Sequence, residues 1–463
     1  MYLYIQYSRS PLPGQANGGG VAGQDTVTRA LARRALTIPH EPSTIDVMRT
    51  LKIALKVLAG LVIAPWVLIG VLLIWWNVRR PPSFVTPPEL KHENWVAVAA
   101  GKDLRTQHLS NTDLVQFGGS FLLVHARTKW HLEDRRGALV VQRSADARAW
   151  EEVARITVPD TDVRDPKFAV IGGRLFLYFL PNTSFDPSPK TTYWTVSDDG
   201  VNWQEPREVD GIWLPDGKGG WTLSRSWNFW RPKTRDGKTW YMLASGPLPG
   251  ASRHVSALVR SVDGLRWEMV SPVWTVYGNG EPEMEFQDDG SIIACLRCGS
   301  LGVPGYEFGN PTANTVIAVA RPPYTEWSTA HSFITRLDGS TMFSVGGMVF
   351  AAGRNHLGPR RDLGNHLATK RTAIYEVTRD RLVHLFDLPS SGDTAYTGVV
   401  VRGDDVFVSY YTPPIERDYP WIVAICFQPR TDIRISRFSA AGLLAVADAA
   451  ARAAGGAPAP KGD

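Results

Sequence analysis

Short segments of alternating apolar residues, each preceded by a glycine turn, recur along most of this 463-residue chain. They read GGSFLLVHA, GGRLFLYF, DGKTWYMLA, DGSIIACLR, GGMVFAAGR and GDDVFVSYY, with turn glycines at Gly119, Gly173, Gly237, Gly290, Gly347 and Gly403. These glycines lie 53 to 64 residues apart. Alternation of period two predicts strands, and a repeat of about fifty residues is typical of propeller blades. The pattern therefore predicts an all-β fold, a six-bladed β-propeller over residues 81–438.

A second pattern, Ser-x-Asp-x-x-x-Trp, follows a further strand in three of the repeats. The three sets are Ser144/Asp146/Trp150, Ser197/Asp199/Trp203 and Ser261/Asp263/Trp267. An Asp at such a place can accept backbone N–H bonds across a hairpin turn, and the Trp can pack the turn onto the sheet. We interpret these strings as structural elements of the fold and not as catalytic groups.

One uncharged apolar run, residues 57–76, has no alternation. As a helix it would be roughly 30 Å long, the thickness of a bilayer core, so it predicts a transmembrane helix within a signal anchor at residues 48–80. More basic residues precede the run than follow it, which places the N-terminus in the cytoplasm and exports the propeller, to a periplasm if the source is a double-membraned bacterium. A cleaved signal peptide is disfavoured because no small-residue cleavage site follows.

The two ends of the chain lack the strand pattern. Residues 1–47 show no apolar periodicity and are expected to be disordered, or to be an extension that is absent if translation starts at Met48. Residues 439–463 are rich in alanine and predict one helix followed by a disordered tail.

Charge and cysteine content exclude several function classes. The net charge is +5, but residues 1–80 hold nine Lys and Arg against three Asp and Glu, so the predicted propeller is nearly neutral and nothing favours nucleic acid. The cysteines, Cys295, Cys298 and Cys426, are expected to be buried thiols, because a zinc site would need a second pair of ligands. No phosphate loop, dinucleotide fingerprint or zinc-binding His pair is present, so we expect no cofactor and no metal.

Hairpin geometry brings arginines to one end of the predicted blades. Counted from the turn glycine, Arg127, Arg297 and Arg354 lie at positions +8, +7 and +7, at nearly the same height. Glu281 lies on the strand before its turn at a matching distance, so it should lie beside Arg297.

Four more residues belong to the strands that precede these turns: Arg164, Tyr396, Arg231 and Asp113. An arginine cluster at one end of the strands suits a carboxylate, because guanidinium groups offer paired planar donors. The sequence therefore favours a small anionic ligand such as a sugar acid.

The chain resembles the sialidase-like six-bladed propellers, whose Asp-box (BNR) repeats look like the Ser-Asp-Trp strings, over about residues 93–438. In retaining sialidases a Glu precedes an Asp-Gly hairpin and an Arg ends the next strand, and GEPEMEFQDDGSIIACLR is similar, with Glu281 and Arg297 in the matching places. KRTAIYEV offers Arg371 for a second family arginine, and DTAYTGVVV offers Tyr396 for the nucleophile. The resemblance implies Glu281 as base, Tyr396 as nucleophile, and Arg297 with Arg371 as a carboxylate clamp.

Two family positions differ. The first-blade arginine of the family has no counterpart in HLSNTDLVQF, so another arginine would complete the clamp: Arg127, Arg164, Arg231 or Arg354. The acid/base Asp of the family would fall in WHLEDRR, which offers His131, Glu133 and Asp134. Of these we favour Asp134, with His131 next because imidazole exchanges protons near neutral pH.

The chain is also similar to a branch of these propellers labelled exo-sialidase or BNR-repeat proteins, in segments that include Thr112-Asp113-Leu114 and Arg164-Asp165-Pro166-Lys167. The first hypothesis is a membrane-anchored, exo-acting, retaining glycoside hydrolase of sialidase type that acts on a glycan. The second is a hydrolase or lyase for another acidic sugar, using Asp113, Asp165 or His131. The third is a glycan-binding propeller without catalysis.

Overall fold

The computed structural model describes residues 44–78, 84–132, 134–181, 191–251, 254–276, 279–299, 312–357, 369–428 and 430–455. The chain divides into two units, Tyr2–Arg79 and Arg80–Asp463. Within the described residues, the first unit contributes one helix and the second contains all the strands.

Helix α1 (Thr44–Val78) is the described part of the first unit. Its segment Val47–Leu72 is long and apolar enough to cross a membrane. Membrane anchors and signal sequences both contain such segments. The helix begins before the predicted run 57–76, because the charged residues that precede the run include Lys and Arg, which are good helix formers. Of the segment 1–47 that was predicted to be disordered, residues 44–47 are helical and the rest lies outside the described residues.

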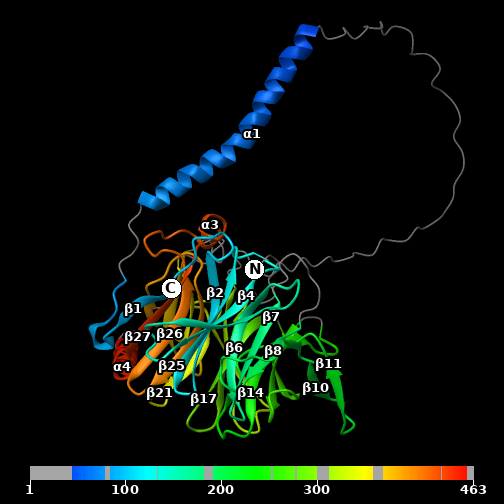
Figure 1. The fold of residues 1–463 in the computed structure, drawn as a ribbon, viewed down its shortest axis with the longest axis vertical. Coiled ribbons are helices and arrows are strands. Elements are labelled where there is room, and N and C mark those ends of the chain that lie inside the picture. Colours follow the sequence, from blue (N-terminus) through cyan, green and yellow to red (C-terminus); the bar gives the residue numbers. More distant parts are fainter. Residues whose placement is uncertain are drawn as a thin grey trace, which may run out of the picture. The chain divides into compact units, whose positions relative to one another are not determined.

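The second unit is a propeller of mainly antiparallel sheets (Figure 1). Five of the sheets have four strands each. The first has β2 (His108–Phe117), β3 (Ser120–Thr128), β4 (Ala138–Ser144) and β5 (Glu151–Ile156), and the second has β6 (Val163–Ile171), β7 (Arg174–Pro181), β8 (Tyr193–Ser197) and β9 (Arg207–Glu208). Two others are β17 (Asn279–Phe286), β18 (Ile292–Cys298), β19 (Asn314–Ala320) and β20 (Ser328–Ser332), then β21 (Thr341–Val345), β22 (Met348–His356), β23 (Lys370–Val377) and β24 (Leu382–Leu388). The last is β25 (Ala395–Arg402), β26 (Asp405–Thr412), β27 (Asp432–Ser439) and β1 (Glu93–Val98).

The remaining sheet has seven strands. They are β10 (Ile212–Pro215), β11 (Trp221–Ser224), β12 (Asn228–Phe229), β13 (Lys233–Thr234), β14 (Trp240–Pro247), β15 (His254–Ser261) and β16 (Trp267–Trp274). Its β10–β11 hairpin extends the sheet beyond β16, with which β10 pairs in parallel. This sheet lies in sequence between the second and the third of the four-stranded sheets.

The two ends of the propeller meet in one sheet. Strand β1, from its N-terminal end, pairs antiparallel with β27, from its C-terminal end. Helix α4 (Ala440–Gly455) then packs against the short helix η1 (Pro88–Leu90), where a side chain on Gly442 would place its Cβ 2.2 Å from the carbonyl oxygen of Glu89. Glycine is therefore required at position 442. The predicted C-terminal helix is present, and the tail 456–463 lies outside the described residues.

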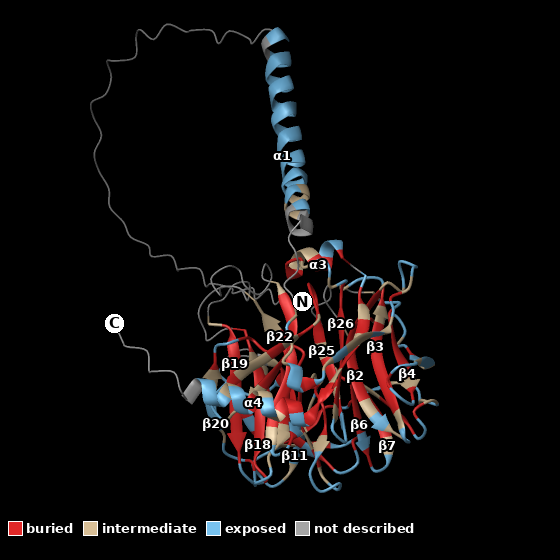
Figure 2. Cartoon of the chain, turned by 90° about the vertical axis from the view of Figure 1, so that its left-hand side faces the viewer, coloured by how far each residue is buried: buried red, intermediate tan, exposed pale blue. Residues whose placement is uncertain are grey.

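The hydrophobic core consists of clusters between sheets that follow one another in sequence. One example brings Leu122 and Val124 of β3 against Phe168 of β6 and Leu177 of β7. The last cluster joins the last sheet to the first. Figure 2 shows the result: the strands are mostly buried and the turns are exposed. The predicted glycine hairpins join β2–β3, β6–β7, β13–β14, β17–β18, β21–β22 and β25–β26.

The Ser-Asp-Trp strings form turns as the sequence indicated. Asp199 accepts the backbone N–H groups of Val201 and Asn202 at 2.8 and 2.7 Å. The Trp203 indole donates to the Gly200 carbonyl at 3.2 Å. The Asp263 and Trp267 turn has the same contacts.

Replacing Trp267, which is fully buried, with alanine should lower the free energy of unfolding by about 3–5 kcal/mol, because the change leaves a cavity beneath the turn. The loss is measured from urea denaturation curves. Trp221→Ala is the matched control, since Trp221 is 38% exposed and should lose much less. Equal losses in both variants would contradict a structural role for the buried indole.

Candidate active site

Four strands that open a sheet carry a β-bulge near their first residues, at β2, β6, β17 and β25. A non-glycine residue at each bulge has positive φ: Asn111 at 49°, Asp165 at 50°, Glu281 at 46° and Tyr396 at 51°. Such backbone costs of order 1–3 kcal/mol per residue and persists only where its surroundings fix it. Since a bulge re-aims the side chain that it carries, the four residues are candidates for one site.

Tyr396 and Glu281 are in direct contact. The Tyr396 hydroxyl donates to Glu281 Oε1 at 2.6 Å, and the Gly339 N–H donates to Glu281 Oε2 at 2.7 Å. Gly339 itself has φ of 57°, and a Cβ there would lie 2.7 Å from the Tyr396 ring. Burial raises the pKa of Tyr396, and the negative charges of Glu281 and Asp165 raise it further. The resting phenol is therefore neutral.

Asp338 links the arginines of the site. Arg297 donates to Glu281, and its Nε lies 3.1 Å from Asp338 Oδ1. Arg336 binds both oxygens of Asp338 at 2.8 and 3.1 Å, and Arg354 lies 3.6 Å from Oδ2. Burial alone would raise the pKa of Asp338, but the charges of Arg336 and Arg297 hold it well below the usual range. Glu281 lies beside Arg297, as predicted.

Arg354 approaches the Tyr396 ring from a neighbouring sheet. Its guanidinium carbon lies 5.5 Å from the ring centroid, within the range of a cation–π contact. Its Nε donates to the Thr394 carbonyl at 2.8 Å and its terminal nitrogen to Asp393 at 3.2 Å. A positive charge is thus held beside the phenol.

Asp165 lies at the bulge of β6, and the charge of Glu281 acts on its carboxyl group. Asn111 donates a hydrogen bond to its carboxyl group. Burial raises the pKa of Asp165; the charge of Lys167 opposes that rise and the charge of Glu281 adds to it. Besides Glu281, the site therefore has a second carboxyl group, and its pKa is raised above the usual value.

Asp113 and Arg231 form a buried network that reaches Thr397, the residue after Tyr396. Arg231 donates to Asp113 at 2.8 Å, to Glu283, and to the carbonyl of Thr397 at 3.4 Å. Asp113 also accepts the Phe168 N–H at 2.7 Å. These predicted residues join strands of different sheets.

The connection between β3 and β4 is held by Arg164. Its guanidinium binds Asp162 and the carbonyls of residues 130–132. Within this connection Asp134 accepts the N–H groups of Lys129 and Arg136 at 2.8 and 3.2 Å, so it closes its own turn. His131 Nδ1 lies 2.7 Å from Asp393. Glu133 lies outside the described residues.

Two of the predicted arginines pair with carboxylates that do not belong to the cluster around Tyr396. Arg127 pairs with Glu152 on β5 at 2.7 Å. Arg371 makes a bidentate pair with Asp418, at 2.8 and 2.5 Å, and is 1% exposed. Among the described contacts, Asp338 links Arg297 to Arg354. None of these contacts links Arg297 to Arg371.

Four residues near the site were not predicted from the sequence: Arg336, Asp338, His356 and Asn111. His356 Nε2 lies 2.9 Å from Asp338 Oδ2, and burial, with the charge of Lys370, lowers its pKa to about 3. The Asp-Gly of RLDGS just before β21 was a usable signal, since the bulged residues of the other sheets lie at equivalent places in their repeats.

Among the cysteines, Cys295 and Cys298 are buried as expected, and burial raises the pKa of Cys295. Cys426 is exposed, so the prediction was wrong for it. It lies on the short helix α3 (Trp421–Phe427), which buries Trp421, Ala424 and Ile425.

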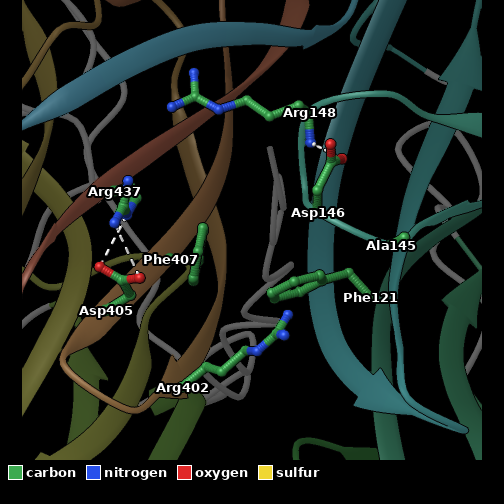
Figure 3. A pocket seen from close by; sticks show the side chains of 8 residues that line it. All are labelled: Phe121, Ala145, Asp146, Arg148, Arg402, Asp405, Phe407 and Arg437. Atoms are coloured by element: carbon green, nitrogen blue, oxygen red, sulfur yellow. Dashed lines mark hydrogen bonds and ion pairs between the residues drawn. The ribbon is translucent and has the colours of Figure 1, made fainter.

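A separate pocket of about 320 Å³ lies between the first and last sheets (Figure 3). Its lining residues are Phe121, Ala145, Asp146, Arg148, Arg402, Asp405, Phe407 and Arg437. Arg402 and Asp405 flank the β25–β26 turn, whereas Tyr396 lies near the start of β25. The pocket is therefore at the opposite end of the strands from Tyr396.

No family model and no curated protein matches the sequence. Solved structures share the fold. A protein of unknown function from Dyadobacter fermentans has a TM-score of 0.54 and 15% identity, covering 75% of this chain and 99% of its own. The sialidase of Trypanosoma rangeli in complex with the inhibitor DANA has a TM-score of 0.57 and 12% identity, covering 78% of this chain and 62% of its own.

An α-L-arabinofuranosidase from Fusarium graminearum in complex with an iminosugar inhibitor is also similar, with a TM-score of 0.51 and 12% identity, covering 74% of this chain and 96% of its own. These identities are low, so the likeness concerns the propeller fold. The chain spans about three fifths of the sialidase.

Asp338→Asn should lower the free energy of unfolding by about 3–5 kcal/mol, because it leaves the buried Arg336 and the partly buried Arg297 without their shared carboxylate. Asp198→Asn is the control: its pair with Arg174 is 76% and 41% exposed, so less than about 1 kcal/mol should be lost. Urea denaturation of both variants measures the difference. A loss at Asp338 no larger than at Asp198 would show that the cluster does not stabilise the fold.

Proposed function

We propose that this protein is a retaining, exo-acting glycoside hydrolase that uses Tyr396 as nucleophile and Glu281 as its base. The observation that carries the proposal is the 2.6 Å hydrogen bond from the Tyr396 hydroxyl to Glu281 Oε1, made between two bulged strands of different sheets. A neutral phenol is a weak nucleophile until a base removes its proton, and Glu281 is in position to do so. Likeness of fold to a sialidase and an arabinofuranosidase supports glycosidase chemistry.

The first half of the reaction would make the glycosyl–enzyme. As Tyr396 Oη bonds to the anomeric carbon, its proton passes to Glu281, and the bond to the leaving oxygen breaks. Arg354, whose guanidinium carbon lies 5.5 Å from the ring centroid, would stabilise negative charge as it develops on the phenol. Water would then bond to the anomeric carbon as the bond to Tyr396 Oη breaks, and Glu281 would return its proton to the Tyr396 hydroxyl.

We assign the general acid to Asp165 in preference to Asp134 and His131. Asp165 occupies a bulge equivalent to those of Tyr396 and Glu281, and burial raises its pKa, which favours the form that donates a proton. Asp134 is occupied in its own turn and His131 faces Asp393. After protonating the leaving group, Asp165 would accept a proton from the attacking water.

For the substrate we propose a terminal acidic sugar of the sialic acid kind, bound by Arg297 and Arg354. The Trypanosoma rangeli sialidase has been solved with sialic acid. A neutral sugar is the second candidate, and one observation favours it: both arginines already contact the carboxylates Glu281, Asp338 and Asp393. We further infer that residues 48–80 anchor the propeller in a membrane, with residues 81–438 exported.

We also infer that the seven-stranded sheet is one blade of a six-bladed propeller of the sialidase-like family. Support comes from positive-φ residues that recur every 54 to 61 residues, at Asn111, Asp165, Ser226, Glu281, Gly339 and Tyr396. Ser226 belongs to the segment before β12, inside the sequence range of the seven-stranded sheet. The Ser-Asp-Trp turns would then be Asp-box repeats.

Tyr396→Phe and Glu281→Gln should each lower kcat roughly 10³-fold or more, and the double variant should lose little beyond that, because the two residues act as a unit. Release of a fluorophore from aryl α-sialoside, uronide and α-L-arabinofuranoside substrates measures the loss and identifies the sugar. Tyr193→Phe is the matched control, since Tyr193 donates to Glu208 at 3.0 Å on an outer edge. Full turnover by folded Tyr396→Phe would exclude the mechanism.

Asp165→Asn should lower kcat about 10²- to 10⁴-fold for a poor leaving group and much less for an activated aryl group, which needs no protonation. The wild type should lose kcat/KM as pH rises through the raised pKa of Asp165, because the acid form is then lost; the variant should lack this alkaline limb. Asp134→Asn serves as control with an unchanged profile. If Asp134→Asn removed the limb instead, Asp134 would be the acid.

A further inference from the structure

Three metal-binding side chains converge at the end of the propeller where Asp393 lies. His108 begins β2, His131 lies in the connection between β3 and β4, and Asp393 lies in the connection between β24 and β25. One ligand atom from each can be chosen so that all three lie within 4.8 Å of one another. The side chains of His131 and Asp393 are only 12% and 3% exposed, and His108 is 2% exposed.

Neighbouring groups orient these side chains. Asp393 Oδ1 accepts the Trp421 indole N–H at 2.7 Å and a bond from Arg354 at 3.2 Å, while Oδ2 faces His131 Nδ1 at 2.7 Å. His108 Nδ1 lies 3.2 Å from the Thr431 hydroxyl. Metal ligands in proteins are characteristically held in this way by a second set of hydrogen bonds.

We propose that His108, His131 and Asp393 bind a divalent first-row transition metal, with zinc as the favoured ion. Two imidazoles and one carboxylate form a ligand set of zinc and related metals, whereas calcium and magnesium prefer oxygen ligands alone. Three protein ligands leave a fourth position for water or a substrate group. No metal was expected from the sequence, because the three residues lie far apart in the chain and show no ligand spacing.

The site would tie the connections of the first and last sheets together. Asp393 would bind the metal through Oδ2 and keep Arg354 on Oδ1, and Arg354 lies beside the Tyr396 ring. The metal would therefore fix the position of Arg354 without taking part in the proposed Tyr396 chemistry. The proposal stands on His108, His131 and Asp393 alone and does not depend on a glycosidase function.

The test is zinc binding by the full chain in detergent. The background is Cys426→Ser, since an exposed thiol binds zinc adventitiously. After chelator treatment and dialysis against zinc, metal per chain is measured by mass spectrometry. We expect about one zinc per chain. His108→Gln should bind zinc at least 10-fold more weakly, and His384→Gln should bind it with unchanged affinity. This control removes the imidazole of His384, whose Nε2 lies 2.9 Å from Asp387 Oδ1, outside the proposed metal site.

Equal zinc affinity in His108→Gln and His384→Gln, or no zinc in the Cys426→Ser protein, would overturn the proposal. X-ray absorption of the zinc-loaded Cys426→Ser protein decides the matter without a ligand variant. Nitrogen and oxygen ligands at about 2.0–2.2 Å support the site, and a sulfur shell near 2.3 Å contradicts it. Since these readouts measure metal and not turnover, they are separate from the test of Tyr396.

Discussion

Charge balance among buried side chains is the constraint on which the candidate site depends. The bulged strands of several sheets bring ionisable groups together away from water, and a buried charge without a partner costs several kcal/mol. Asp338 therefore serves Arg297, Arg336 and Arg354 at once. Behind Tyr396 the same rule places Arg231 against two carboxylates. The positions of the candidate residues therefore depend on this pairing of buried charges as well as on the strands that carry them.

The same balance bears on the choice of sugar. Arg297 and Arg354 already contact carboxylates of the protein, so a ligand carboxylate would have to share them, and binding would move charge within the cluster. A neutral sugar would leave every pair intact. The proposed chemistry of Tyr396 and Glu281 would serve either substrate, because it would act at the anomeric carbon and not on the substituents of the ring.

The sequence predicted the hairpins and the contacts within them. Glu281 and Arg297 could be placed side by side because β17 and β18 belong to one hairpin, whose turn Gly290 sets the register. The contact of Glu281 with Tyr396 joins different sheets, so only the family resemblance pointed to it. The bulges were invisible, because nothing in composition marks Asp165 as a residue with positive φ. The loop contacts of His131 and the pairing of Arg371 with Asp418 depend on tertiary packing.

Arg127 was predicted to lie at the site because its position along its strand nearly matches those of Arg297 and Arg354. Position along a strand, however, does not decide where a side chain points. Arg297 and Arg354 lie at position +7 from their turn glycines, and Arg127 lies at +8. Successive side chains of a strand point to opposite faces, so a difference of one residue reverses the direction. Arg127 accordingly pairs with Glu152 on β5, and the buried Ala126 occupies position +7. The residues that meet at the site are thus selected by strand parity and by bulges, two local features that can vary while the repeated hairpin stays the same.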